Sequence, residues 1–150
     1  MADAVQYGAL CWRTGKLGPE ILLITSRETG RWVIPKGWPI DGLAPSETAA
    51  REAWEEAGVR PDALGACLGG YGYDKVLGRG GPKETVQPCH VRVFALKVAA
   101  LTPEFPERDE RDRLWCSTAE AANMVDEPEL RDLIAGFSPL VDEASPRRGA

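Results

Sequence analysis

Several features that mark other classes of protein are missing from this chain of 150 residues. No apolar run approaches the ~20 residues of a membrane-spanning helix, so we expect no contact with a membrane. The opening residues, Met1 to Gln6, lack the basic and then apolar layout of a secretory signal. The chain has one histidine, and its four cysteines form no C-x-x-C pair, which argues against a zinc site. We therefore expect reduced, mostly buried thiols in a cytoplasmic protein.

Positive charge is also in short supply. The chain has 18 Lys and Arg against 23 Asp and Glu, which gives a net charge of −5. This balance argues against a broad nucleic-acid surface, although it leaves room for a local basic pocket around a small anionic substrate. The glycines between positions 69 and 81 do not link a strand to a helix, so they lack the context of a dinucleotide-binding loop.

What the sequence does contain is an alternation of strand and helix patterns along one domain. We expect strands over 5–13, 21–26, 32–34, 64–73, 85–101 and 114–116, a loop over 35–39, and helices over 45–57, 117–124 and 127–137. Mixed strands with helices on each side predict an α/β fold, a layered α/β/α sandwich. We expect a single domain over residues 1–143 and a disordered tail over 144–150.

The most informative segment is the helix predicted over 45–57. Glu52, Glu55 and Glu56 follow one another at i, i+3 and i+4, so they lie within an arc of ~100° on the helix. Like charges at this spacing repel, and oxygen-only carboxylate clusters are what hard divalent cations such as Mg²⁺ prefer. The competing interpretation is an ordinary solvated helix with ion pairs. The residues expected on the opposite, buried side are Ala50, Ala53, Trp54 and Ala57.

The ends of this helix are well marked in the sequence. Pro45 suits the first helical position, and Glu47 complements the positive end of the helix dipole. Gly58 stands where a left-handed C-terminal cap is expected. Arg51 is four residues from both Glu47 and Glu55, so we expect it to hold one carboxylate in place while the others face a metal.

The residues around this helix resemble the Nudix box, which reads Gly, five residues, Glu, seven residues, then Arg-Glu-apolar-x-Glu-Glu-x-Gly-apolar. One position departs from the pattern, because Leu43 stands where the first Glu is expected. The resemblance implies a Nudix-type α/β/α sandwich, with a mixed sheet and the box as a loop-helix-loop. The residues that match in register are Gly37, Arg51, Glu52, Glu55, Glu56, Gly58 and Val59.

The Nudix resemblance also implies a Mg²⁺-dependent pyrophosphohydrolase, in which Mn²⁺ would suit the same oxygen ligands. It implies metal ligands at Glu52, Glu55 and Glu56, joined by the backbone carbonyl of Gly37, and an orienting role for Arg51. A metal held there would neutralise phosphate charge and lower the pKa of the attacking water. The expected general base is Glu55 or Glu56, and the alternatives are Glu107 and Glu110.

The run Arg31 to Pro39 is similar to the Nudix branch that hydrolyses diphosphoinositol polyphosphates and diadenosine polyphosphates. Substrates so crowded with phosphate need cations around the pocket, and an exposed tryptophan can stack on an adenine. The expected partner is a small phosphorylated substrate, bound by a monomer or homodimer. The substrate contacts that we expect are Lys36, Arg13, Arg27, Trp38, Lys83 and Arg92, with Lys75 as a further candidate.

Two alternatives stay open at this point. The first is a nucleotide clean-up enzyme that acts on an oxidised dNTP or on ADP-ribose, although no long aromatic-rich insertion supports it. The second is a non-catalytic Nudix module that binds a nucleotide or another phosphorylated ligand. Leu43 keeps this second alternative open, because a fold alone does not establish a chemistry.

Overall fold

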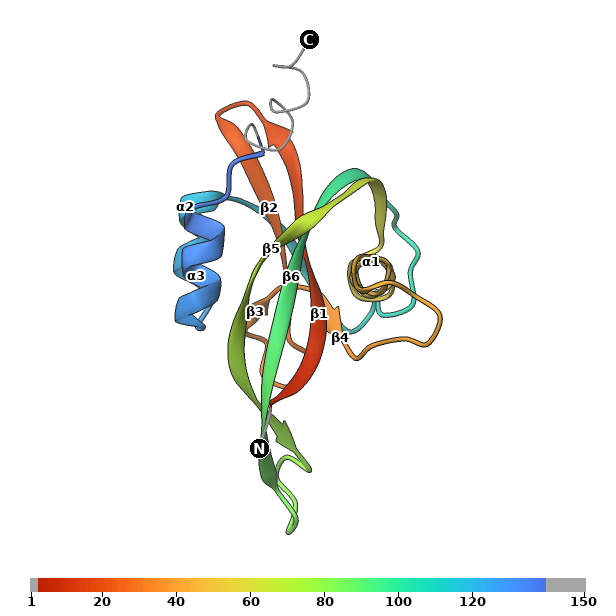
Figure 1. The fold of residues 1–150 in the computed structure, drawn as a ribbon, viewed down its shortest axis with the longest axis vertical. Helices are drawn as coiled ribbons and strands as arrows, with labels where there is room; N and C mark the ends of the chain where they lie inside the picture. Colours follow the sequence, from red (N-terminus) through yellow and green to blue (C-terminus); the bar gives the residue numbers. More distant parts are fainter. Residues whose placement is uncertain (1–2, 140–150) are drawn as a thin grey trace.

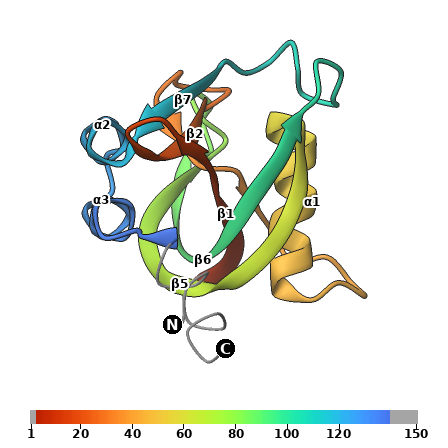
Figure 2. The same ribbon diagram turned by 90° about the horizontal axis from the view of Figure 1, so that it is seen from above.

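The computed structural model describes residues 3–139, so the predicted tail over 144–150 lies outside it. A mixed sheet forms the centre, with the strand order β3-β2-β1-β6-β5, while β4 pairs with β1 and β7 pairs with β2. Helix α1 (Pro45–Ala57) covers one face of the sheet (Figure 1). Helices α2 (Thr118–Met124) and α3 (Pro128–Ala135) cover the other (Figure 2). This arrangement confirms the predicted α/β/α sandwich.

The strands agree with the predicted ones except at β4 and β5. β5 is far longer than the strand predicted over 64–73, and its register against β6 shifts four times between Arg60 and Gly69. Such bulges interrupt the alternation by which a strand is recognised in a sequence. β4 forms a short ladder with β1 where we predicted a loop. The bounds are β1 Ala4–Gly15, β2 Gly18–Thr25, β3 Trp32–Val33, β4 Lys36–Gly37, β5 Val59–Leu77, β6 Thr85–Leu101 and β7 Arg113–Ser117.

The sheet separates two apolar cores. Successive side chains of a strand point to opposite faces, and β1 shows this directly. Leu10 and Trp12 pack with residues of α2 and α3, whereas Ala9 and Cys11 pack with residues of α1. β1 also runs parallel to β6 and antiparallel to β2 and β4, so it holds the middle of the molecule together.

Helix α1 begins and ends at the predicted residues. Glu47 closes its first turn by accepting a hydrogen bond of 2.7 Å from the backbone N–H of Ala44. Gly58 caps the other end in the left-handed conformation, with φ 68° and ψ 27°. A Cβ atom at Gly58 would lie 2.6 Å from the ring of Phe105, so the close approach of residues 102–112 also requires glycine here.

The buried side of α1 differs from the predicted one. Ala53 and Ala57 are buried as expected, but Trp54 is only half-buried and lies under the guanidinium of Arg60. Glu56 is buried instead, together with Thr48 and Ala49. Alanines at every fourth position let the helix lie close to the sheet, and this contact turns Glu56 inward. The three glutamates therefore do not share one solvated side.

The predicted free and mostly buried thiols are confirmed, and helix α2 has a well-formed N-terminal cap. Ser117 and Glu120 form a reciprocal capping box at the start of α2, with hydrogen bonds of 2.9 and 3.1 Å. All four cysteines are free, and Cys67 alone among them is exposed.

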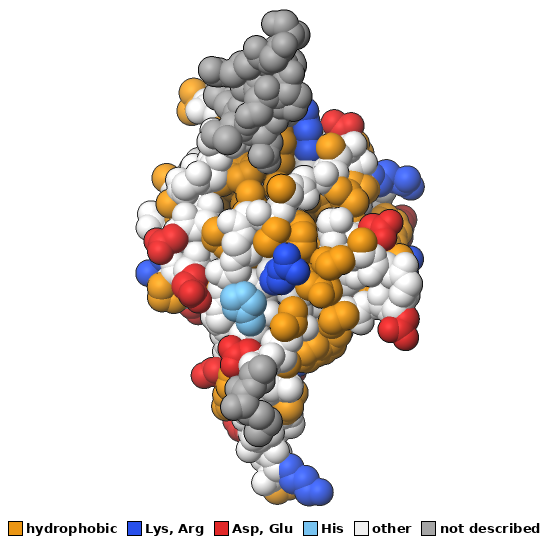
Figure 3. All heavy atoms as spheres, viewed as in Figure 1, with side chains coloured by type: hydrophobic (Ala, Val, Ile, Leu, Met, Phe, Trp, Pro, Cys, Tyr) orange, Lys and Arg blue, Asp and Glu red, His pale blue; other side chains and the backbone are white. Residues whose placement is uncertain are grey.

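Within residues 3–139, no helix has the length and apolar character to cross a membrane. On the face drawn in Figure 3, basic and acidic side chains are interspersed among apolar ones.

Candidate active site

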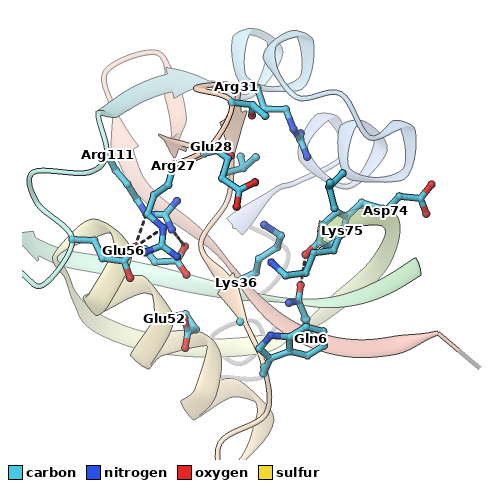
Figure 4. Close-up of a pocket in the computed structure, with 18 of the residues that line it drawn as sticks. Gln6, Arg27, Glu28, Arg31, Lys36, Glu52, Glu56, Asp74, Lys75 and Arg111 are labelled. Atoms are coloured by element: carbon cyan, nitrogen blue, oxygen red, sulfur yellow. Dashed lines mark hydrogen bonds and ion pairs between the residues drawn. The ribbon is translucent and has the colours of Figure 1, made fainter. Parts of the chain in front are cut away.

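A cavity of about 470 Å³ opens beside α1 and β4. Its walls come from α1, β4, the second half of β5, the loop after β2 and the segment that precedes β7. The side chains in Figure 4 converge on it from these separate elements. Its charged lining residues are Arg27, Glu28, Arg31, Lys36, Glu52, Glu56, Asp74, Lys75, Arg79, Glu107 and Arg111.

Two of the predicted metal ligands, Glu52 and Glu56, line this cavity. Burial raises the pKa of Glu56 to about 8, although the guanidinium of Arg111 opposes this rise. Burial also raises the pKa of Glu52, and the nearby charge of Glu55 adds to the effect. Without a cation, burial therefore favours the protonated form of Glu56.

Gly37 lies against Glu52. A Cβ atom at position 37 would come within 2.4 to 2.8 Å of three carboxylate atoms of Glu52, so any side chain there would displace that carboxylate. The ladder between β4 and β1 places Gly37 opposite Tyr7 and fixes this approach. The glycine that opens the Nudix box thus has a steric reason in this fold.

Glu55 and Arg51 lie differently from the expectation. The side chain of Glu55 does not line the cavity, and its backbone carbonyl accepts a hydrogen bond of 3.0 Å from the N–H of Glu107. Arg51 is exposed and makes no ion pair among residues 3–139. Its expected partner Glu47 is engaged in capping the helix. The structure therefore does not contain the predicted contacts through which Arg51 would orient a carboxylate.

The donors present fit a Mg²⁺ ion that is completed by substrate. In the described part of the chain, no three His, Cys, Asp or Glu side chains are grouped as a ready-made metal site. Mg²⁺ is commonly held by one or two carboxylates, together with waters and the phosphates of a substrate. Glu52 and Glu56 offer such a pair, while the ligand roles of Glu55 and Gly37 stay predictions.

Sequence reasoning missed Arg111, a buried cation beside these carboxylates. Its Nε donates to Oε1 of Glu107 at 2.8 Å, and its Nη1 donates to the carbonyl of Thr25 at 3.0 Å. Its Nη2 lies 3.7 Å from Oε1 of Glu56. The spacing of four residues between Glu107 and Arg111 is the available signal in the sequence, but the same spacing is common in ordinary surface ion pairs.

The two alternative bases occupy different places. Glu107 lines the cavity, where Arg27 lies 3.8 Å from its Oε1. Glu110 does not line the cavity and is paired with Nη1 of Arg27 at 3.2 Å. The geometry therefore favours Glu107 over Glu110 as a group that acts on a bound substrate.

Basic side chains form another wall of the cavity. Lys36 and Lys75 extend into it (Figure 4), and Nζ of Lys36 lies 4.9 Å from the ring centroid of Tyr73. Burial lowers the pKa of Lys36, and the charges of Arg31 and Lys75 add to this effect while that of Glu56 opposes it. Within residues 3–139, neither lysine forms an ion pair with a carboxylate. Both are therefore available to an anionic ligand.

The remaining cations of the cavity are already paired. Arg31 lies 2.9 Å from a carboxylate oxygen of Glu127, and its Nη1 is buried without a hydrogen-bond partner. Arg79, in the turn after β5, is bonded to Glu28 at 2.8 Å and so joins two loops at the cavity. These pairings reduce the charge that is free to bind phosphate.

Half of the predicted substrate contacts line the cavity, namely Arg27, Lys36 and Trp38. Trp38 has 42% of its surface exposed, which is unusual for a large apolar side chain. Leu43 does not line the cavity, and its backbone N–H closes a turn by donating to the carbonyl of Ile40. The departure from the box pattern therefore lies outside the cavity.

The other three predicted contacts lie elsewhere. Arg13 is paired with Glu20 at 2.7 Å and stacks over Trp115. Arg92 lies over the ring of Phe94, and Lys83 stands in the exposed turn between β5 and β6. The expectation that these cations surround the same pocket is not met, because strand pairing decides which way each side chain points.

Comparisons with known proteins support the resemblance to the Nudix family that the box residues carry. The NUDIX domain model matches residues 5–137. Human diphosphoinositol polyphosphate phosphohydrolase 3-alpha is 38% identical over 119 residues, covering 77% of this chain and 65% of that protein. Nudix hydrolase 13, mitochondrial, of Arabidopsis thaliana is 34% identical over 133 residues, covering 83% and 62%. The chain thus spans less than two thirds of the length of these relatives.

Solved structures agree at the level of the fold. A binary complex of Caenorhabditis elegans Ap4A hydrolase has a TM-score of 0.65 at 21% identity, covering 93% of this chain and 98% of that one. The NUDIX domain of Shewanella oneidensis NrtR, complexed with ADP ribose, has a TM-score of 0.64 at 16% identity, covering 89% and 86%. The match of the NUDIX domain model takes in the whole box and the segment that carries Glu107 and Arg111, and this chain belongs to the Nudix family.

Proposed function

We propose that the protein is a Mg²⁺-dependent pyrophosphohydrolase that cleaves a phosphoanhydride in a diphosphate linked to another moiety. The observation that carries this proposal is one cavity with two kinds of wall. Glu52 and Glu56 present a pair of carboxylates, while Lys36 and Lys75 present cations without acidic partners among the described residues. Such a cavity suits a ligand that brings both a metal ion and negative phosphate.

Each group has a proposed part in the reaction. Glu52 and Glu56 would hold the metal, with Glu55 and the carbonyl of Gly37 as further predicted ligands. The bound metal would lower the pKa of the attacking water and offset the charge on phosphate. Lys36 and Lys75 would bind phosphate oxygens and hold the substrate. The proton of the water would pass to a cavity carboxylate, for which Glu107 is as well placed as Glu56.

The proposed substrates are dinucleoside polyphosphates or diphosphoinositol polyphosphates. The names of the human relative and of the C. elegans structure support this pair of classes. Most of the cations in the cavity are already engaged by carboxylates, and an exposed Trp38 lies at the same cavity. Both features favour a nucleotide with a linear phosphate chain, since its base can stack on an aromatic ring.

The assay that tests this proposal measures phosphate and nucleotide release with Mg²⁺ from a panel of substrates. The panel contains a diphosphoinositol phosphate, diadenosine penta- and hexaphosphate, ADP-ribose and oxidised dGTP. We expect turnover of the diadenosine compounds and its loss in Glu56→Gln. Turnover of ADP-ribose or oxidised dGTP alone would replace the proposed substrate by the clean-up alternative. Binding without turnover of any compound would favour a non-catalytic module.

We also propose a cytoplasmic monomer or homodimer that binds neither nucleic acid nor membrane. Three of the four cysteines are buried and all are free, which supports a reducing compartment. Fractionation of cells that express the tagged protein, together with light scattering of the purified protein, checks the location and the assembly state.

A further inference from the structure

We propose that Arg111, rather than Arg51, is the residue that positions the carboxylates facing the metal. This inference rests on the metal site proposed above and adds to it a residue outside the Nudix box. Arg51 is exposed and makes no ion pair within residues 3–139. The side chain of Arg111 is only 9% exposed and faces both Glu56 and Glu107.

The guanidinium of Arg111 reaches three separate elements at once. Nη1 is bonded to the last residue of β2, Thr25, at 3.0 Å, and Nε to Glu107 at 2.8 Å. Nη2 faces Glu56 of α1 at 3.7 Å. A rigid planar fork with several N–H donors can make these contacts together, whereas a lysine ammonium would satisfy fewer of them.

The backbone around Arg111 fixes its place in advance. The N–H of Asp112 donates to Oγ1 of Thr25 at 2.8 Å, and the carbonyl of Asp112 accepts from the N–H of Thr25 at 3.1 Å. The N–H of Glu107 is bonded to the carbonyl of Glu55 on α1 at 3.0 Å. The segment 102–112 is therefore fastened to both β2 and α1, and the cation between them has little freedom to move.

This placement matters because three carboxylates, Glu52, Glu56 and Glu107, line one small cavity. Removing a buried counter-ion leaves charged groups without compensation, so the carboxylates would turn away or take up protons. Residues that orient metal ligands through hydrogen bonds typically change metal affinity or activity by about 10- to 100-fold when they are replaced.

The test uses Arg111→Gln, which removes the charge, and Arg111→Lys, which keeps the charge but loses the fork. Mn²⁺ binding without substrate is measured by electron paramagnetic resonance, and kcat and KM are measured with Mg²⁺. We expect both variants to lose about tenfold in Mn²⁺ affinity and in kcat, with KM changed less than about threefold. Arg60→Gln is the matched control, because Arg60 is an exposed cation that lies over Trp54 of α1 and does not line the cavity.

The outcomes separate this inference from the proposed function. If Arg111→Lys binds Mn²⁺ like the unchanged protein, charge alone suffices and the positioning role is refuted. A loss in Arg51→Gln that equals or exceeds the loss in Arg111→Gln would return the role to Arg51. If the unchanged protein binds Mn²⁺ but cleaves none of the substrates, the proposed activity fails while the binding data still decide about Arg111. A melting curve of each variant shows that it is folded.

Discussion

At the residue scale, the site depends on how closely Gly37 approaches Glu52. A methyl group at position 37 would meet only the end of a flexible side chain, because its contacts are carboxylate atoms and not backbone. The added methyl group would therefore displace the Glu52 carboxylate more than it would disturb the packing of the core. Stability and metal binding can thus be separated at this one position.

We expect Gly37→Ala to weaken Mn²⁺ affinity and to lower kcat by about 10- to 100-fold, because the Glu52 carboxylate must move. The melting temperature should fall by no more than a few degrees. Gly72→Ala is the control, since a Cβ atom there meets its neighbours at ordinary distances of 3.8 Å. A large loss of stability with unchanged metal affinity would contradict this account.

The buried carboxyl of Glu56 makes a second prediction, about pH. Burial raises its pKa in the folded protein from an ordinary 4.5 to about 8. Its proton therefore stabilises the metal-free fold fully below about pH 4.5, and this stability is lost as the pH rises through 8. In EDTA, the unchanged protein should lose up to a few kcal/mol across this range.

The variant Glu56→Gln has no such proton to lose, so its melting temperature should fall less between pH 5 and pH 8.5. Mg²⁺ added at pH 8.5 should restore stability to the unchanged protein, because the charge of the ion compensates the buried carboxylate of Glu56 that has lost its proton. Melting curves in both buffers check this. Parallel pH profiles of the two proteins would show that Glu56 is ordinary in the folded state.

At the element scale, helix α1 was predictable because its signals are local. Pro45 and Gly58 mark its ends, and both were read from single residues. Its buried side was predicted less well, because small alanines at 49, 53 and 57 admit the sheet more closely than Trp54 does. Local chemistry fixes where a helix begins and ends, while the partner surface decides how it is rotated.

Contacts between residues that are distant in the sequence also decided which side chains reach the cavity. Arg13 and Arg92 were expected at the pocket, but their positions on paired strands send them elsewhere. Arg111 could not be assigned to the cavity from the sequence, since its hydrogen bond with Thr25 joins residues 86 positions apart in the chain. Glu52 and Glu56 were found because a helix brings near neighbours together, whereas Arg111 was missed because the fold brings it to them from a distant part of the chain.

The cap of α1 gives a prediction at this scale. We expect Gly58→Ala to destabilise the fold by about 2 kcal/mol or more, since a side chain is strained at this φ and would also meet Phe105. Gly80→Ala shares the positive φ of 79° but has nothing within 4 Å of the added atom. Urea unfolding of both variants isolates the close contacts with Phe105 and with the carbonyl of Thr102. Equal losses of stability in the two variants would show that these contacts do not matter.

At the scale of the whole molecule, negative charge dominates, with a net value of −5. An anionic substrate must therefore be attracted by a few cations inside one cavity and not by the surface as a whole. Lys36 and Lys75 line the cavity, while Arg13 and Lys83 lie outside it. The faces of the molecule should thus differ sharply in their effect on substrate binding.

We expect Lys36→Ala and Lys75→Ala to raise KM by about tenfold each with kcat changed little, since a lost phosphate contact weakens substrate and transition state alike. Arg13→Ala and Lys83→Ala should leave KM within about twofold, as should the exposed Lys16→Ala. Steady-state kinetics across the five variants checks this. A raised KM in Arg13→Ala would move the substrate to a different face.

The parallel pairing of β1 with β6 has a consequence for the order in which the molecule is made. During synthesis the carboxylates of α1 leave the ribosome well before β6 and the segment that carries Arg111. Pairing between such distant strands is slow to form, because a long loop must close first. A nascent chain halted ahead of residue 85 would contain the complete Nudix box but would lack β6, which joins β1 to β5, and the cavity residues Glu107 and Arg111. The site therefore cannot exist until that later segment has been made.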